Sequence, residues 1–186
     1  MRKLLVFNNV SLDGYFSDAA GDLSWAHRQD DEWKAYVADN AKGDSTLLLG
    51  RVTYELMVRF WPTAQAIELM PAMAERMNNR EKVVFSRTLE TASWNRTRLV
   101  KGDPAAEVRR MKKEPGPSMV LLGSGSIVSL LAQEGLIDEY QLVVNPIILG
   151  KGRSMFSGVQ RTLNLKMTRT RTFKNGNVLL CYEQEA

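Results

Sequence analysis

The stretch VLLGSGSIVSLL, from Val120 to Leu131, decides the fold because two glycines and two serines join an apolar run to a helical pattern. The run is typical of a buried strand, and the pattern after it is typical of a helix. Two interpretations of the turn stay open, because glycines let a backbone approach an anion at a helix start and also allow a tight connection. GSGS lacks the third glycine of a dinucleotide fingerprint and the lysine of a P-loop. The spacing therefore predicts a strand, a turn and a helix without choosing between the two roles.

The same strand-to-helix unit recurs along the chain. Apolar runs predict strands over residues 3–11, 45–50, 82–86, 98–100 and 118–123. Periodicity and capping residues predict helices over 30–42, 51–61, 66–79 with an interruption at Pro71, 103–114 and 126–134. In the second of these helices, Val52, Leu56 and Phe60 keep helical spacing. Near the end, two alternating segments flank Asn175-Gly176, a strong hairpin signal.

This order of elements predicts an α/β protein. We expect a three-layer α/β/α sandwich, with a central mixed, mostly parallel sheet and a C-terminal antiparallel hairpin at one edge. The length of 186 residues predicts one domain over residues 1–186.

The bulk composition bounds the classes of function. A net charge of +4 with scattered basic residues suits a phosphorylated ligand, but it is small for a nucleic-acid binder, so we expect no nucleic-acid partner. No window reaches the roughly 18 apolar residues of a membrane span, so we expect no membrane contact and a cytoplasmic protein. The single histidine, His27, and the single cysteine, Cys181, lie too far apart in the sequence to build a zinc site, and we expect no metal. Cys181 has the setting of a buried strand residue.

Candidate ligand residues follow three of the predicted strands. Ligands of open α/β sheets bind beyond the carboxyl ends of the strands. The residues at these ends are Gly50, Arg51 and Thr53, then Ser86 and Arg87, and then Gly123, Ser124, Gly125, Ser126 and Ile127. Arg51 has the fork geometry that favours phosphate, and it is equally explained as a surface arginine.

Five motifs in order carry a family resemblance, namely SLDGYF, LLLGRVTYE, VVFSRT, VLLGSGSIVSLL and GLIDEYQLVVNPIILGKGRSMF. Together they resemble the dihydrofolate reductase-like superfamily, and within it the reductase domain of riboflavin-biosynthesis enzymes and its stand-alone relatives. The resemblance runs from about Lys3 to Glu183. It implies NADPH as hydride donor, a small-molecule substrate, a mixed sheet between helices and a homodimer.

The resemblance also implies roles for individual positions. Gly50, Arg51 and Thr53 match the motif that holds the adenosine side of the cofactor. Ser86 and Arg87 match the strand end near the 2'-phosphate, and Gly123 to Ile127 match the turn that meets the diphosphate. Asp13 and Gly14 match the loop that borders the nicotinamide and the substrate.

Two departures concern the substrate. Riboflavin-pathway reductases usually carry an acidic residue just before the glycine turn, where this chain has Leu122. A deaminase domain often accompanies them, and we expect none here. Classical dihydrofolate reductases hold the pterin with a carboxylate at the start of the helix after the first loop, where this chain has Asp30, Asp31 and Glu32. Asp31 is the candidate there, and complementing the helix dipole is the alternative role.

The chemistry that the resemblance implies is hydride transfer. Asp13 is the candidate proton donor, with a turn-forming role as the alternative. Three tryptophans, Trp25, Trp33 and Trp61, either wall a pocket for a flat substrate or pack in the core. The main hypothesis is an NADPH-dependent reductase of a small heteroaromatic or pterin-like substrate. The alternatives are the 5-amino-6-(5-phosphoribosylamino)uracil reductase of riboflavin biosynthesis and a nucleotide-binding protein without turnover.

Overall fold

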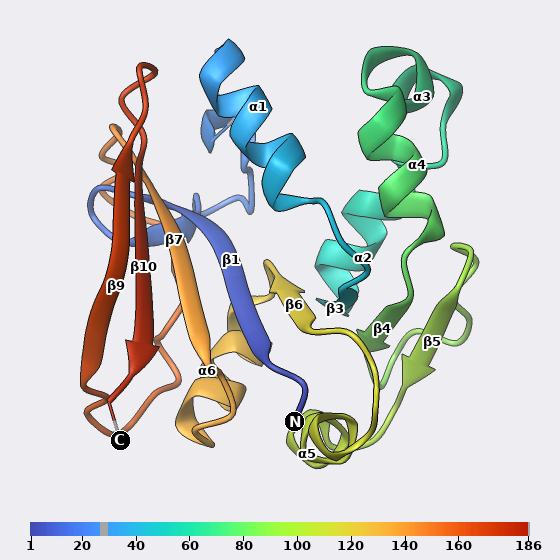
Figure 1. Cartoon of the computed structure of the whole chain (residues 1–186). Helices are drawn as coiled ribbons and strands as arrows, with labels where there is room; N and C mark the ends of the chain where they lie inside the picture. Colours follow the sequence, from blue (N-terminus) through green and yellow to red (C-terminus); the bar gives the residue numbers. More distant parts are fainter. Residues whose placement is uncertain (27–29, 186) are drawn as a thin grey trace.

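A computed structural model describes residues 1–26 and 30–185 (Figure 1). Eight strands form the main sheet in the order β5-β4-β3-β6-β1-β7-β10-β9. The pairs from β5 to β7 are parallel, while β10 runs antiparallel to both β7 and β9. The strands are β1 (Leu4–Ser11), β3 (Thr46–Gly50), β4 (Lys82–Phe85), β5 (Thr97–Val100), β6 (Met119–Leu122), β7 (Glu139–Asn145), β9 (Leu165–Thr172) and β10 (Val178–Gln184). The predicted mixed sheet with a C-terminal antiparallel hairpin is confirmed.

Helices cover both faces of this sheet, as the three-layer prediction requires. Figure 1 shows α5 and α6 on one face, and α1, α2 and α4 on the other. The helices are α1 (Asp31–Asn40), α2 (Arg51–Val58), α3 (Ala64–Leu69), α4 (Pro71–Asn79), α5 (Pro104–Lys113) and α6 (Gly125–Gln133), with a short 3-10 turn, η1 (Ser24–Ala26). Two short strands outside the main sheet, β2 (Tyr15–Ser17) and β8 (Arg153–Ser154), pair with each other.

Local sequence signals account for most element ends. Asp30 caps α1 by accepting the Trp33 N–H at 2.6 Å, and Asp103 caps α5 by accepting two backbone N–H groups. Pro71 is the first residue of α4, so the helix predicted over 66–79 is two helices that meet at this proline. Gly176 has a φ of +89° in the loop between β9 and β10, which confirms the predicted hairpin.

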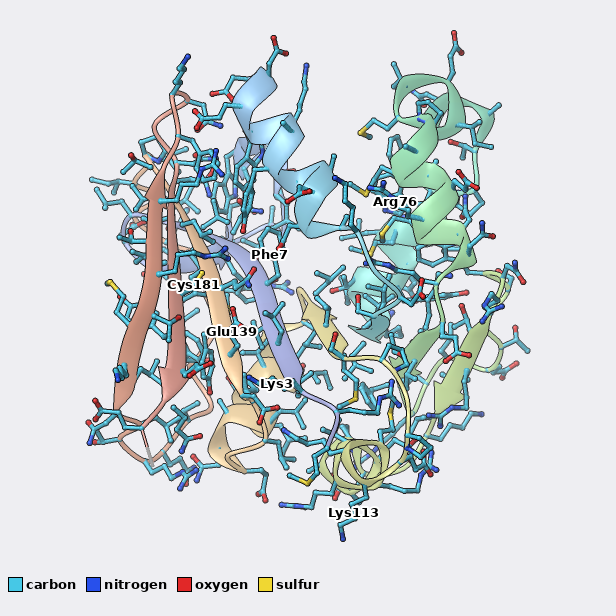
Figure 2. All side chains as sticks on the ribbon, in the orientation of Figure 1. Lys3, Phe7, Arg76, Lys113, Glu139 and Cys181 are labelled. Atoms are coloured by element: carbon cyan, nitrogen blue, oxygen red, sulfur yellow. The ribbon has the colours of Figure 1, made fainter. Side chains whose placement is uncertain are left out.

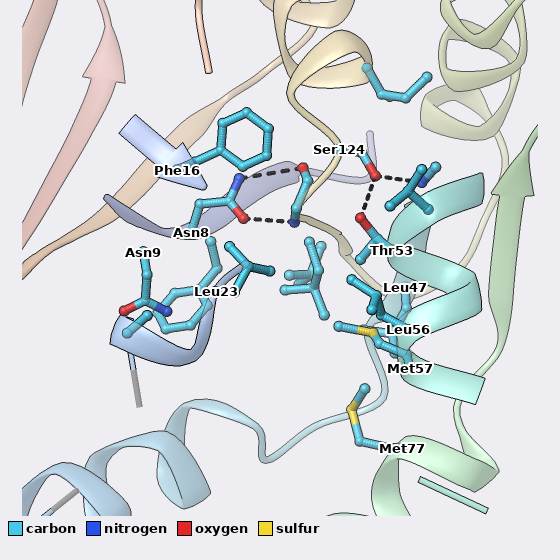
Figure 3. Close-up of a pocket in the computed structure, with 18 of the residues that line it drawn as sticks. Asn8, Asn9, Phe16, Leu23, Leu47, Thr53, Leu56, Met57, Met77 and Ser124 are labelled. Carbon is cyan, nitrogen blue, oxygen red and sulfur yellow. Dashed lines mark hydrogen bonds between the residues drawn. The ribbon is translucent and has the colours of Figure 1, made fainter. Parts of the chain in front are cut away.

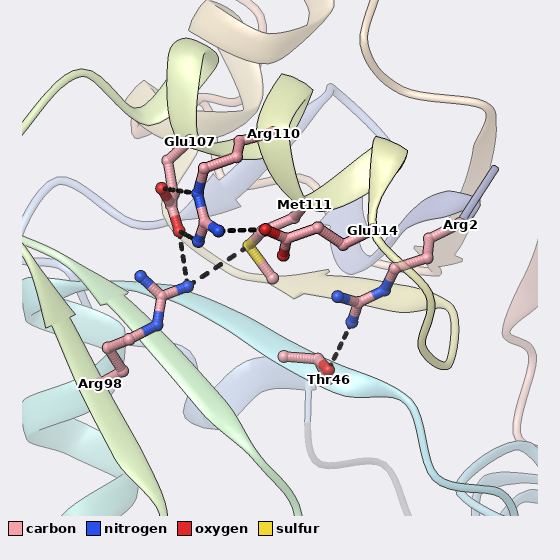
Figure 4. A network of polar contacts seen from close by, with 7 residues as sticks. All are labelled: Arg2, Thr46, Arg98, Glu107, Arg110, Met111 and Glu114. Atoms are coloured by element: carbon pink, nitrogen blue, oxygen red, sulfur yellow. Dashed lines mark hydrogen bonds and ion pairs between the residues drawn. The ribbon is translucent and has the colours of Figure 1, made fainter.

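An ion-pair network joins α5 to the edge strand β5 (Figure 4). The Glu107 carboxylate lies 2.5 Å from an Arg98 nitrogen and 2.7 Å from an Arg110 nitrogen. Only 14% of the Glu107 side chain is exposed. These contacts hold the pKa of Glu107 at about 2, because both guanidinium groups favour the ionised form.

The core leaves part of one sheet face open. The largest apolar cluster lies between the sheet and α5 and α6, and it includes the fully buried Val6 and Leu121. On the opposite face one cluster packs under α1, with Cys181 in it as predicted, and another packs under α2 and α4. Phe7 on β1 lies between these two helical groups and is only partly buried (Figure 2). The middle of this face is therefore available for a ligand.

Two apolar residues of α2 that keep the predicted helical spacing lie on its exposed face and not in the core. Val52 and Leu56 keep the predicted period, but they are 50% and 47% exposed, while Tyr54 is buried. Val52, Leu56 and Phe60 line the cleft described below. The helical prediction is confirmed, and the apolar stripe faces a cavity instead of the core.

Candidate functional site

A cleft of about 2520 Å³ opens on the uncovered part of the sheet (Figure 3). Its floor includes Leu5 and Phe7 from β1 and Val120 and Leu122 from β6, and its walls come from α1, α2 and α4. Small-molecule sites usually measure roughly 300–1,000 Å³. The cleft therefore has room for a dinucleotide together with a second small molecule.

Two turns at the carboxyl ends of β3 and β6 are locked together beneath this cleft. The Ser124 hydroxyl accepts the Gly50 N–H at 2.7 Å and shares a hydrogen bond of 2.8 Å with the Thr53 hydroxyl (Figure 3). Gly123 and Ser124 both have a φ of +58°, a left-handed conformation that costs a serine about 1 kcal/mol or more. The strain is held by bonds that join residues about seventy positions apart in the sequence.

Glycine is required in these turns because the chains approach closely. A Cβ at Gly50 would lie 2.6 Å from the Ser124 hydroxyl oxygen, and a Cβ at Gly123 would lie 2.6 Å from that of Thr53. A Cβ at Gly125 would lie 2.6 Å from the Phe16 ring. The glycines therefore let the turns pack closely against Ser124, Thr53 and Phe16. No side chain caps the start of α6, and the first N–H groups of a helix have no acceptor within it. This is the geometry of an anion cradle.

Sequence reasoning missed Asn8, which holds the glycine turn from the neighbouring strand. Its amide oxygen accepts the Gly123 N–H at 2.6 Å, and its amide nitrogen lies 3.4 Å from the Gly123 carbonyl and 3.5 Å from the Met155 sulfur. The side chain is only 7% exposed. The available signal was the pair Asn8-Asn9 inside an otherwise apolar strand.

The predicted cofactor residues all line the cleft, from Gly50, Arg51 and Thr53 through Ser86 and Arg87 to Gly123–Ile127. The Arg51 guanidinium lies 3.0 Å from both carboxylate oxygens of Glu55, so its charge is partly compensated. Ser86 caps a turn by accepting the Leu89 N–H at 2.9 Å. Arg87 forms no ion pair with any group in the described part of the chain. The cleft thus presents two guanidinium groups near the strand ends.

Asp13 and Gly14 do not line the cleft. The Asp13 carboxylate accepts the N–H groups of Leu149 at 3.1 Å and Gly150 at 2.8 Å, which ties the loop after β1 to the loop after β7. Hydrogen bonds, first from Ser11 and then from these amides, lower the pKa of Asp13. This geometry favours the turn-forming role, because a carboxylate that is ionised at neutral pH has no proton to donate.

The acidic residues at the start of α1 also lie outside the cleft. Asp31 is exposed and lies 3.9 Å from Lys34, and Asp30 is the helix cap. Glu32 binds Arg171 at 3.0 Å, and this hydrogen bond lowers the pKa of its carboxyl. The structure therefore favours the helix-start role for Asp31. The carboxylates that do line the cleft among the described residues are Asp22, Asp44 and Glu139.

The tryptophans divide between core and cleft. Trp33 is 5% exposed and packs edge-on against Phe173 at 5.0 Å, so it is mainly a core residue with one edge on the cleft. Trp25 does not line the cleft, and its indole N–H bonds to the Asp22 carbonyl at 3.1 Å. Trp61 lines the cleft.

Residues 1–26 and 30–185 contain no group of three or more His, Cys, Asp or Glu side chains that could hold a metal ion, and His27 lies outside them. In the same ranges, no helix combines the length and the apolar character that crossing a membrane needs.

The fold and the cleft define the class of this protein as an α/β sandwich of the dihydrofolate reductase type. Dihydrofolate reductase from Enterococcus faecalis, solved with NADP(H), superposes with a TM-score of 0.66 at 12% identity, covering 99% of this chain and 97% of that one. A putative riboflavin biosynthesis protein from Shewanella sp. PV-4 superposes with a TM-score of 0.75 at 22% identity, covering 99% of both chains. The chain belongs to the RibD C-terminal domain family, whose model matches residues 2–179.

A sequence relative is similar to this chain over nearly its whole length. The protein YyaP of Bacillus subtilis (strain 168) is 29% identical over 97% of this chain and 94% of its own length. The resemblance inferred from the five motifs is confirmed by the family match.

Proposed function

We propose that this protein is an NADPH-dependent reductase that transfers a hydride to a small heteroaromatic or pterin-like substrate. The observation that carries the proposal is the pair of interlocked turns beneath the cleft. The uncapped start of α6, which follows the second turn, suits a diphosphate because helix N-termini favour anions. The size of the cleft suits a dinucleotide and a substrate bound side by side.

Each part of the site has a role in this proposal. The turn from Gly123 to Ile127 would hold the diphosphate, while Gly50 and Thr53 would border the adenosine side. Of the arginines that line the cleft, Arg51 and Arg87 follow the strand ends and would bind a 2'-phosphate. When bound, NADPH supplies the hydride, so the chain's own residues have to bind, orient and exclude water. The apolar floor of the cleft suits that task.

Family membership supports a reductase, and the NADP(H) complex of the E. faecalis enzyme supports this cofactor. Leu122 lines the cleft just before the glycine turn. An apolar side chain there offers no acidic contact, so we propose a substrate other than the riboflavin-pathway uracil derivative.

The test is NADPH oxidation followed at 340 nm with pterin, pyrimidine and quinone acceptors, run beside NADPH and NADH titrations without acceptor. We expect tighter binding of NADPH than of NADH, and turnover with at least one flat heterocycle. Binding without turnover on any acceptor would favour the nucleotide-binding alternative. Absence of NADPH binding would refute the cofactor assignment.

A further inference from the structure

We propose that Asn9 selects the substrate by donating a hydrogen bond to it, and that Asn145 sets this selectivity by fixing the orientation of the Asn9 amide. Asn9 follows Asn8 on β1 and points to the opposite face of the sheet, where it lines the cleft. Figure 3 shows it on the wall across from Thr53 and Leu56. The inference rests on the proposed reductase function and names the substrate group that this site recognises.

The orientation of the Asn145 amide follows from its backbone neighbours. The Asn145 side chain is 0% exposed, and its nitrogen lies 3.0 Å from the Val143 carbonyl oxygen and 3.3 Å from the Val10 carbonyl oxygen. Carbonyl oxygens only accept, so the NH2 group has to face them. The reverse orientation would place three oxygens against one another.

This arrangement in turn orients Asn9. The Asn145 nitrogen also lies 3.1 Å from the Asn9 side-chain oxygen. If the Asn9 amide were turned over, two NH2 groups would face each other without an acceptor between them. The Asn9 oxygen therefore faces the Asn145 nitrogen and accepts a hydrogen bond from it. The Asn9 nitrogen has no hydrogen-bond partner among residues 1–26 and 30–185, so it can donate a hydrogen bond to a ligand in the cleft.

The buried side chain of Asn145 lowers the stability of the fold, which indicates that the residue has another role. Its side-chain oxygen is buried and has no hydrogen-bond partner among the described residues. An unpaired buried oxygen destabilises a fold, and an apolar residue at this position would avoid that cost. Because its nitrogen orients a residue of the cleft, Asn145 is best explained as a positioning residue.

The chemistry of the selected group follows. The Asn9 oxygen is turned toward Asn145, so the amide presents its NH2 donors to the cleft. Donors favour a ring carbonyl or an unprotonated ring nitrogen and disfavour an amino group at the same place. A hydrogen-bonding site rejects an analogue that leaves its buried polar group unpaired, on the order of tenfold per group. We therefore assign to Asn9 the recognition of a carbonyl oxygen or an unprotonated ring nitrogen of the substrate.

The experiment uses lumazine (pteridine-2,4-dione) and 2,4-diaminopteridine as matched probes, titrated calorimetrically into the full-length protein saturated with NADPH. We expect the wild type to bind lumazine about tenfold tighter or more. Asn9→Asp keeps an acceptor toward Asn145 and presents an oxygen to the cleft, so the preference should reverse. Asn145→Ala frees the Asn9 amide to rotate, so the ratio of the two probes' dissociation constants should approach one while NADPH binding is retained.

Two controls separate selectivity from folding. Asn95→Asp makes the same change on an exposed residue outside the cleft and should keep the wild-type ratio. Asn9→Ser removes the oriented amide without adding charge, so in this variant too the ratio should fall. It keeps the inference testable if Asn145→Ala fails to fold. Equal wild-type binding of the two probes, binding of neither, or an unchanged ratio in Asn9→Asp overturns the inference. Failure of the NADPH titration on the same preparations contradicts the proposed function instead.

Discussion

Replacing Gly50 with alanine tests whether the two turns beneath the cleft act as one unit. Gly50 has a φ of −82°, so alanine adopts its backbone conformation without strain. The new Cβ would nevertheless lie 2.6 Å from the Ser124 hydroxyl oxygen, which is itself held by Thr53. The clash therefore has to separate the turn after β3 from the turn after β6.

The magnitude follows from three contributions. Overpacking costs about 1–3 kcal/mol, and loss of the Gly50 N–H bond to Ser124 costs about 1 kcal/mol or more. Alanine also restricts the unfolded chain more than glycine does, which stabilises the folded protein by about 0.4–1 kcal/mol. We expect Gly50→Ala to lower the free energy of unfolding by about 1–3 kcal/mol and to weaken NADPH binding.

A double-mutant cycle with Ser124→Gly isolates the contact. Ser124→Gly removes the hydroxyl that the alanine would meet, and it also relieves the left-handed strain at position 124. In urea unfolding, the double variant should be more stable than the sum of the single effects predicts, by about 1 kcal/mol or more. Additive effects within about 0.3 kcal/mol would refute the interlocked-turn model.

Three further predictions concern the arginines of the cleft, the ion pairs of Glu107 and the oligomeric state. Arg51→Ala or Arg87→Ala should weaken NADPH more than NADH in fluorescence titrations, and equal loss would place that arginine away from the 2'-phosphate. Because the pKa of Glu107 falls from 4.5 to about 2 on folding, its contribution of up to about 3 kcal/mol is present above pH 4.5 and lost as pH falls toward 2. Glu107→Gln should remove this part of the pH dependence of urea unfolding, and an unchanged pH profile would contradict it. We expect a homodimer whose interface includes Leu12 and Ile148, which are 65% and 70% exposed, so aspartate at either position should shift sedimentation toward monomer. A wild-type monomer would contradict this.

Much of the fold was determined by local sequence. Asp30, Asp103 and Pro71 mark helix starts through their own backbone chemistry, and Asn175-Gly176 marks the hairpin. Such signals act within a few residues, so they are visible without a structure. The glycine turns were also found from sequence, because glycine and serine between a strand and a helix predict a turn in any context.

The tertiary structure decided how these pieces form a site. The sheet order places β1 between β6 and β7, which brings Asn8 to Gly123 and Asn9 to Asn145 across more than a hundred residues. The spacing of Val52 predicted a helix but not that its apolar stripe faces a cleft, because periodicity defines a face and not what covers it. Likewise, the role of Asp13 depends on amides from a distant loop. Hydrogen-bond partners and burial depend on strand order, and no local pattern encodes strand order.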